Sequence, residues 1–104
     1  MITIKSIAEF VEREFLLNPK CITTGQSHAR HISKPRQIAH WLARKLTGHS
    51  YPMIGHHMKR DHTTIVYSYA VVEREIANGT DMGMRAIEIM QKIQAQEQAQ
   101  RQAA

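Results

Sequence analysis

Apolar residues recur every three to four positions along most of the chain, which is the spacing of an amphipathic α-helix. In the first such segment they are Ile4, Ile7, Ala8, Val11 and Phe15. This pattern predicts a helix over about residues 4–17, and Ser6 with Glu9 fits a capping box at its start. The polar face of this helix carries Glu9, Glu12 and Glu14, which makes that surface acidic.

The segment that follows offers little to bury. Asn18 can cap a helix and Pro19 suits a first helical position, so we expect a short helical turn through Ile22. Small and basic residues then predict a loop over residues 23–32. Cys21 is the single cysteine, so no intrachain disulfide can form, and we expect a small core residue rather than an activated thiol.

A second strong helix is predicted to begin near Ser33, with Pro35 in its first turn, and to stop at Gly48. Its apolar face consists of Ile38, Ala39, Leu42 and Leu46. Trp41 lies beside that face, so we expect it to anchor the core.

Two shorter helical patterns follow, with a tight turn at Lys59 and Arg60 between them. In the first pattern Ser50 can act as the cap, and the buried side is expected to consist of Met53, Ile54 and Met58. Asp61 can cap the second, which ends at Asn78 and Gly79 and whose apolar stripe is Ile65, Tyr69, Val72 and Ile76. Two helices joined in this way form a candidate helix-turn-helix motif.

A last helix is predicted to open near Thr80 and Asp81. We expect it to bury Met84, Ile87, Met90 or Gln91, and Ile93. The Gln/Ala-rich tail beyond it, residues 94–104, is expected to fray or to continue as an exposed helix. Because alternation at period two never persists, the fold class is all-α. We expect a bundle of five to six helices over residues 1–93, followed by the tail.

Composition adds that the chain should fold, because 42% of its residues are hydrophobic. No apolar run is long enough for a membrane span or a signal peptide, so we expect a cytoplasmic protein without membrane contact.

Positive charge is concentrated in one part of the sequence. The formal net charge is +5, yet no acidic residue lies between Glu14 and Asp61. That interval holds Lys20, Arg30, Lys34, Arg36, Arg44, Lys45, Lys59 and Arg60, together with His28, His31, His40, His49, His56 and His57. A one-sided positive field attracts the phosphates of nucleic acid and displaces their counterions. The alternative is a solvated basic surface without a partner. We expect His40 and His49 to be surface or helix-end residues.

The second helix of a helix-turn-helix motif places its N-terminal residues against base edges in the major groove. Here that turn consists of Asp61, His62, Thr63 and Thr64. Asp can accept a hydrogen bond from a cytosine amino group, and Thr can offer its hydroxyl or place its methyl group against that of thymine. His can donate or accept at a base edge. The alternative is that these residues only cap the helix.

Four blocks of sequence occur in order and with compatible spacing. They are Lys34-Pro35-Arg36-Gln37-Ile38-Ala39, Leu42-Ala43-Arg44-Lys45-Leu46-Thr47, Ser50-Tyr51-Pro52-Met53-Ile54-Gly55 and Arg60-Asp61-His62-Thr63-Thr64-Ile65. Together they resemble the C-terminal DNA-binding domain of the bacterial replication initiator DnaA, over nearly the whole chain up to about Ile93. The resemblance implies an all-helical fold related to the Trp repressor and recognition of DnaA boxes, which are short, asymmetric, AT-rich duplex elements.

Matched position by position, the resemblance implies that the Asp61 to Thr64 turn reads the major groove. Arg36, Gln37 and Arg44 match positions that hold the phosphate backbone, and Pro52 matches a further contact. The full set of expected DNA-binding residues is His28, Arg30, Lys34, Arg36, Gln37, Arg44, Pro52, Lys59, Arg60, Asp61, His62, Thr63, Thr64 and Tyr67.

Three positions depart from the family's pattern. His28 stands where the family usually places a minor-groove arginine, and Arg30 can serve instead. The turn before Arg60 is one residue shorter than in many DnaA proteins, with Lys59 where glycine is common. Tyr67 replaces a histidine. These departures can shift the base preference away from the standard box.

The resemblance therefore implies a sequence-specific reader of double-stranded DNA rather than an enzyme. Because no G-x-x-x-x-G-K-[ST] phosphate loop is present, we expect no ATPase activity, no bound nucleotide and no cofactor. Such a domain would regulate or compete in replication initiation or transcription at the nucleoid, for example as a phage or prophage protein. An oligomer is possible, but nothing in the sequence indicates one. Met1 suggests a complete small gene product, although an excised piece of a longer protein would look similar.

Two other functions compete with this one. A metal or hydrolytic site can be imagined at His56, His57 and His62, but no Cys pair, H-E-x-x-H or nearby carboxylate pattern completes it. The other is a protein-interaction module with weak or non-specific DNA binding, in which the tail or an exposed face binds a partner. The composition of the tail favours an inert end.

Overall fold

Five α-helices make up the part of the chain that the computed structural model describes, residues 1–24 and 30–103, with Arg30 described in its backbone only. They are α1 (Ile4–Glu14), α2 (Arg30–Thr47), α3 (Tyr51–Met58), α4 (His62–Ala77) and α5 (Asp81–Ala103). The described residues contain no strand, so the all-α class is confirmed. No helix among them is long and apolar enough to cross a membrane.

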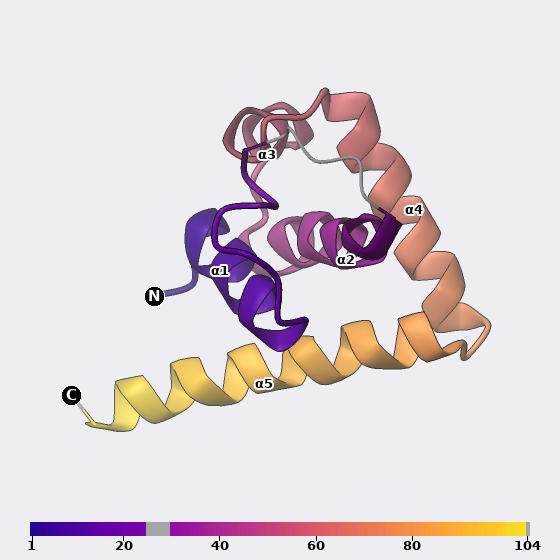
Figure 1. Cartoon of the computed structure of the whole chain (residues 1–104). Helices are drawn as coiled ribbons and strands as arrows, with labels where there is room; N and C mark the ends of the chain where they lie inside the picture. Colours follow the sequence, from indigo (N-terminus) through magenta and orange to yellow (C-terminus); the bar gives the residue numbers. More distant parts are fainter. Residues whose placement is uncertain (25–29, 104) are drawn as a thin grey trace.

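Helix α2 lies at the centre of the molecule, and all four other helices pack against it. In Figure 1 it lies in the middle of the view, with α1, α3 and α4 around it and the long α5 running beneath α1. Trp41 on α2 is buried to 1% exposure, as predicted for the anchor of the core. Ile7 and Val11 of α1, Met58 of α3 and Ile89 of α5 belong to the same buried cluster.

The first helix starts and stops at residues other than those predicted. Thr3, not Ser6, is the N-cap: the Ser6 N–H bonds to the Thr3 hydroxyl at 3.0 Å, and the Ser6 hydroxyl accepts from the Thr3 N–H at 2.9 Å. The helix ends at Glu14 in a Schellman motif, in which Leu16 adopts a positive φ of 55° and the Leu17 N–H bonds to the Glu12 carbonyl at 2.8 Å. Because glycine usually occupies that left-handed position, the leucine concealed the helix end.

Glu12 is buried rather than part of an exposed acidic face. Its side chain is 4% exposed, and its carboxylate accepts a hydrogen bond from the Ile22 N–H at 3.1 Å. Residues 18–24 form hydrogen-bonded turns, including one from the Cys21 N–H to the Asn18 carbonyl at 3.3 Å. The buried carboxylate therefore fastens these turns to α1 and brings Ile22 into the core.

Helix α2 begins at Arg30, one turn earlier than the predicted start at Ser33. Ile32 and Pro35 are both buried and continue the spacing of Ile38 and Leu42 toward the N-terminus. Pro35 lies inside the helix, at its sixth residue, and lacks the N–H that would otherwise bond to the His31 carbonyl. The predicted loop over residues 23–32 is therefore wrong for its last three residues.

The rotation of α5 differs from the predicted one. Its buried residues are Gly83, Ala86, Ile89 and Ile93, whereas Met84 is 60% exposed. A close approach of two helix ends causes this, because a Cβ on Gly83 would lie 2.4 Å from the Glu75 carbonyl oxygen of α4. Turning Gly83 toward α4 turns its neighbour Met84 into solvent. The tail continues α5 as a helix to Ala103, one of the two states expected.

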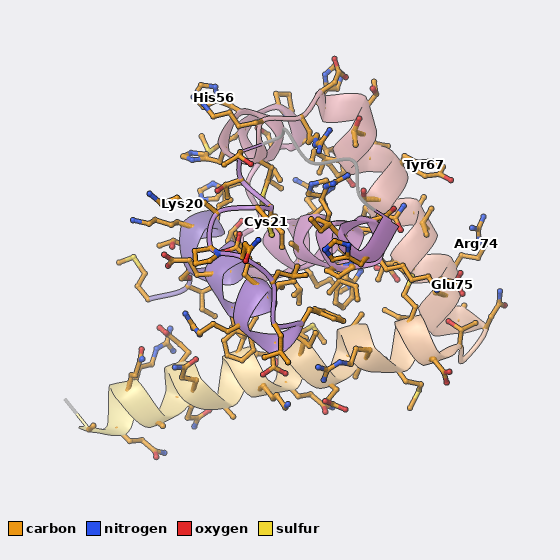
Figure 2. The ribbon with its side chains drawn as sticks, viewed as in Figure 1. Lys20, Cys21, His56, Tyr67, Arg74 and Glu75 are labelled. Carbon is orange, nitrogen blue, oxygen red and sulfur yellow. The ribbon has the colours of Figure 1, made fainter. Side chains whose placement is uncertain are left out.

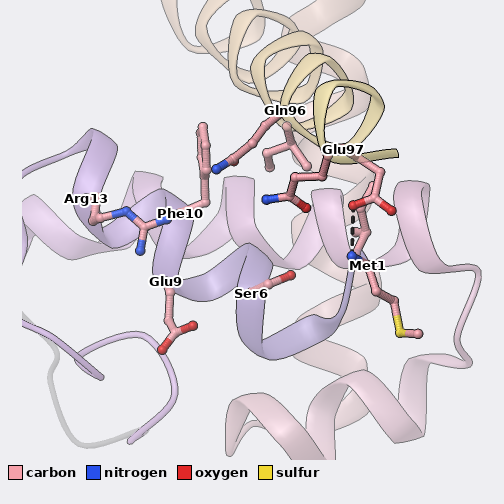
Figure 3. Close-up of a pocket in the computed structure, with 10 residues that line it drawn as sticks. Met1, Ser6, Glu9, Phe10, Arg13, Gln96 and Glu97 are labelled. Atoms are coloured by element: carbon pink, nitrogen blue, oxygen red, sulfur yellow. Dashed lines mark ion pairs between the residues drawn. The ribbon is translucent and has the colours of Figure 1, made fainter. Parts of the chain in front are cut away.

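Ion pairs join α5 to α1, and a pocket is lined by residues of both helices. The Glu14 carboxylate lies 2.9 Å from the Lys92 ammonium and 3.5 Å from the Arg85 guanidinium, which itself sits 5.1 Å over the Phe15 ring. Figure 3 shows the pocket, of about 220 Å³, with the ion pair between the Met1 amino group and Glu97 at its edge.

We predict that Gly83→Ala lowers the free energy of unfolding by about 2–4 kcal/mol, because the new methyl group must push the ends of α4 and α5 apart. Chemical denaturation followed by circular dichroism measures the effect. Met84→Ala, a change at the exposed neighbouring position, serves as the control and should alter stability by less than about 0.5 kcal/mol. Equal stability of the Gly83→Ala variant and the parent would contradict the predicted close approach.

Candidate nucleic-acid interface

A Schellman motif closes α3 and directs the chain into α4. Lys59 adopts the left-handed conformation (φ 58°, ψ 43°), and the Arg60 N–H bonds to the Gly55 carbonyl at 2.9 Å. A Cβ on Gly55 would lie 2.5 Å from the Arg60 carbonyl oxygen, so only glycine allows this approach. Lys59 thus takes the backbone conformation that glycine adopts more easily, at a cost of about 1–2 kcal/mol. The helix-turn-helix arrangement of α3 and α4 is present as predicted.

The start of α3 lies at the surface, at the other end of this helix from the turn. Ser50 caps the helix by accepting from the Met53 N–H at 3.3 Å, and Pro52 occupies the first turn, exposed. The buried side consists of Ile54, Gly55 and Met58. Met53 was predicted to be buried, but it is 45% exposed, because it lies about 100° around the helix from Ile54.

The first turn of α4 is capped by Asp61 and open to solvent. One Asp61 oxygen accepts from the Thr63 N–H at 2.8 Å and from the Thr63 hydroxyl at 2.6 Å. Both hydrogen bonds lower the pKa of the Asp61 carboxyl, and the bond from the Thr63 hydroxyl lowers it most. The Asp61 and His62 side chains remain 67% and 55% exposed, and Thr63 and Thr64 are exposed as well. Capping therefore leaves the four predicted readers accessible.

The solvent-facing side of α4 continues beyond that turn. Tyr67 is 63% exposed and points away from the body of the molecule in Figure 2. Val66, which sequence reasoning did not single out, is 43% exposed on the same side. The sequence did contain a signal for the exposure of Val66. Val66 and Tyr67 follow Thr63 at helical spacing, on the side of the helix opposite the buried residues Ile65 and Val72.

The basic residues of α2 fall at two places around this motif. Arg36 is half-buried and close to Arg60 of the turn. Burial lowers the pKa of the Arg36 guanidinium most, and the positive charge of Arg60 lowers it further. Gln37 beside it is half-buried, and Lys34 and Lys59 are exposed. Arg44 instead lies next to the start of α3, where its Nη1 donates to the His49 carbonyl at 2.8 Å.

The side chains of two predicted contact residues are outside the part of the chain that the structure describes. His28 lies outside the described residues. Arg30 is the first residue of α2, and only its backbone is described.

A buried polar pair joins α2 to the middle of α4. His40, predicted to lie at the surface, is fully buried, and its Nδ1 lies 2.9 Å from the hydroxyl of Ser68, which is also buried. Burial, with smaller contributions from the charges of Arg36 and Arg60, lowers the pKa of His40 to about 3. The histidine is therefore neutral at ordinary pH and ties the two helices together by a hydrogen bond.

The histidines and the cysteine do not assemble into a metal centre within the described part of the chain, where no three His, Cys, Asp or Glu side chains come together to hold an ion. His56 and His57 stack edge to face at 5.7 Å on the exposed side of α3. Cys21 is half-buried, and burial and the nearby Glu12 raise the pKa of its thiol, which disfavours the reactive thiolate.

Comparison with models of protein families matches residues 4–72 to the family described as the bacterial dnaA protein helix-turn-helix. The match runs from the start of α1 through the first two-thirds of α4 and so includes the whole helix-turn-helix arrangement.

Several relatives carry the name chromosomal replication initiator protein DnaA. The protein of Caldanaerobacter subterraneus subsp. tengcongensis is 33% identical over 92 residues, which cover 88% of this chain and 20% of that protein. That of Deinococcus radiodurans is 32% identical over 74 residues, or 71% of this chain and 16% of the relative. The DnaA of Magnetococcus marinus is 48% identical over 52 residues, which cover 49% of this chain and 12% of that protein. The chain thus spans about one fifth or less of the length of these relatives.

We predict that His40 makes stability fall in acid. Its pKa is about 3 in the folded protein against an ordinary value of 6.5, so the unfolded chain binds more protons between these values. The stabilisation is complete above about pH 6.5 and is lost on acidification, by up to about 1.4 kcal/mol per pH unit.

Urea denaturation of the parent and of His40→Leu at several pH values between 7.5 and 4 isolates this contribution. The variant should have the shallower dependence on pH, while His49→Gln, at an exposed histidine, should keep the parent's dependence. Parallel curves for His40→Leu and the parent would contradict the prediction.

Proposed function

The chain belongs to the family of bacterial DnaA helix-turn-helix domains, and on this basis we propose that it binds duplex DNA sequence-specifically, at an element related to the DnaA box. The observation that carries the proposal is the exposed first turn of α4, from Asp61 to Thr64, at the start of the second helix of the helix-turn-helix motif. Arg36 with Arg60 lies near one side of this turn and Arg44 beside the start of α3. A reader of base edges is thereby combined with cations for the backbone.

In this proposal the first turn of α4 enters the major groove and distinguishes bases. The Asp61 carboxylate accepts from a cytosine amino group with the lone pairs that Thr63 does not use. Thr64 presents its methyl group to a thymine methyl and its hydroxyl to a base edge, and His62 donates or accepts beside it. Tyr67 and Val66, exposed on the next turn, extend the apolar contact along the groove.

The cations fix the register of the protein on the duplex without reading sequence. Arg36, Gln37, Lys34, Lys59 and Arg60 serve the phosphates on one side of the recognition turn. Arg44 and the exposed start of α3, including Pro52, serve those on the other side. We also assign His28 or Arg30 to the adjacent minor groove, as the family's pattern implies.

We propose that the domain marks, blocks or regulates sites in replication initiation or transcription, and that it does so without ATPase activity of its own. It would compete with an initiator for the same duplex element, as a phage or prophage protein could. This role needs binding energy and sequence discrimination, and it needs no catalytic group.

Fluorescence anisotropy with three oligonucleotides tests the proposal directly: a duplex DnaA box, a scrambled duplex and the single strand. The box should bind most tightly, and its affinity should fall steeply as salt rises. Equal binding to all three would remove the sequence-specific claim. No binding at low salt would overturn the proposal and favour a protein-interaction module.

Two substitutions should separate reading from positioning. Thr64→Ala is expected to remove about 1–3 kcal/mol of discrimination between box and scrambled duplex, because it deletes a base-edge contact. Arg36→Ala should weaken all duplexes alike and reduce the slope of log affinity against log salt by about one. Arg13→Ala on α1 removes the same charge away from the motif and serves as the control. Identical behaviour of the Thr64 and Arg36 variants would refute the assigned roles.

Asp61→Asn provides a sharper test of base reading, because asparagine caps a helix about as well as aspartate but adds a donor. We predict little change in thermal stability together with a changed preference at one cytosine-containing base pair of the site. Binding to a set of boxes, each with one base pair altered, measures that preference. An unchanged profile would mean that Asp61 only caps α4.

A further inference from the structure

Arg44 is held in place before any ligand binds. Its guanidinium carbon lies 4.6 Å from the centre of the Tyr51 ring, and its Nη1 donates to the His49 carbonyl at 2.8 Å. Tyr51 is the first residue of α3, whereas Arg44 lies in the last turn of α2. The contact therefore spans the connection between the two helices that carry the second group of proposed backbone contacts.

Tyr51 is itself braced by α4. Its ring meets the Tyr69 ring edge to face, with centroids 6.3 Å apart and an interplanar angle of 76°. The Lys45 ammonium lies 3.5 Å from the Tyr69 hydroxyl and 3.0 Å from the Glu73 carboxylate, which also accepts from the Trp41 indole at 3.3 Å. The Tyr51 ring is thus supported by a row of contacts that ends at the central tryptophan.

We propose that Tyr51 is a positioning residue for DNA binding, which holds the Arg44 guanidinium ready to donate hydrogen bonds to a backbone phosphate of duplex DNA. The inference rests on the proposed function and deepens it, because it assigns a role to a residue that would not itself touch the phosphate. The ring face attracts the cation, and the His49 carbonyl fixes its rotation.

The geometry leaves the arginine able to bind a phosphate. A guanidinium has five N–H donors in a planar fork. One donor is used by the His49 carbonyl and one face rests on Tyr51, so the other donors stay available in the plane. Ordering a free arginine costs conformational entropy on binding, whereas a side chain already held in place loses less. Tyr51 therefore raises the affinity that Arg44 provides.

A double-mutant cycle on duplex binding tests this coupling. Tyr51→Leu keeps apolar bulk but removes the ring, and it should weaken duplex binding about three- to tenfold, the range for a cation–π contact. Tyr51→Phe keeps the ring face and should bind within about twofold of the parent. In an Arg44→Ala background, Tyr51→Leu should cause no further loss beyond about twofold.

The control is Phe10→Leu on α1, at the pocket shared with α5 (Figure 3). It also removes an aromatic ring that lies under an arginine, because the Arg13 guanidinium carbon is 5.8 Å from the centre of the Phe10 ring. It should leave DNA affinity unchanged. Nitrogen-15 relaxation of the Arg44 side chain tests the same contact in the absence of DNA. The order parameter of the Arg44 side chain should drop in Tyr51→Leu and persist in Tyr51→Phe.

Three results would overturn the inference: additive losses from Tyr51→Leu and Arg44→Ala, a Tyr51→Phe variant as weak as Tyr51→Leu, or an Arg44→Ala variant that binds like the parent. Each of these requires a parent protein that binds duplex DNA, so each leaves the proposed function standing. Absence of parent binding at low salt overturns the proposed function, and with it this inference.

Discussion

This structure depends on one constraint, the packing of all four remaining helices against α2. One face of α2 buries Trp41, Ile38 and Leu42, so the positions of α1, α3, α4 and α5 are all set relative to a single element. The same helix carries Arg36 and Arg44 on its remaining faces. Burial of the apolar face therefore fixes where these cations stand relative to the turn that begins α4, although neither arginine belongs to the helix-turn-helix motif itself.

Close backbone approaches then set the angles at which the outer helices leave the core. Gly55 lets the Arg60 backbone pass over α3, and Gly83 lets the start of α5 pass against the end of α4. Side chains determine which helices meet, but these glycines determine how close their ends come. The buried His40 and Ser68 pair adds a directional contact between α2 and α4, which a purely apolar interface lacks. The recognition turn is therefore placed by a few contacts outside it.

Charge is distributed to match this geometry. The carboxylates of Glu14 and Glu97 pair with cations along the contact between α1 and α5. The stretch from α2 to the turn before α4 contains no acidic residue before Asp61, whose own carboxylate caps α4. A polyanion approaching the turn between α3 and α4 therefore meets the basic side chains of that stretch, whereas the paired carboxylates of Glu14 and Glu97 lie on α1 and α5.

The sequence alone determined the all-α class, the helix-turn-helix motif, the capping by Ser50 and Asp61, and the helix ends at Gly48 and Gly79, because helical periodicity, caps and glycine are local signals. It failed where a residue acts against its usual preference: Leu16 takes a left-handed conformation, and the end of α1 just before it was not predicted. The burial of Glu12 and His40, the rotation of α5 and the cradle of Arg44 on Tyr51 were decided only by the tertiary structure. Each depends on a partner in another element, Ile22, Ser68, Glu75 or Tyr51, and the periodicity within one helix does not encode such a partner.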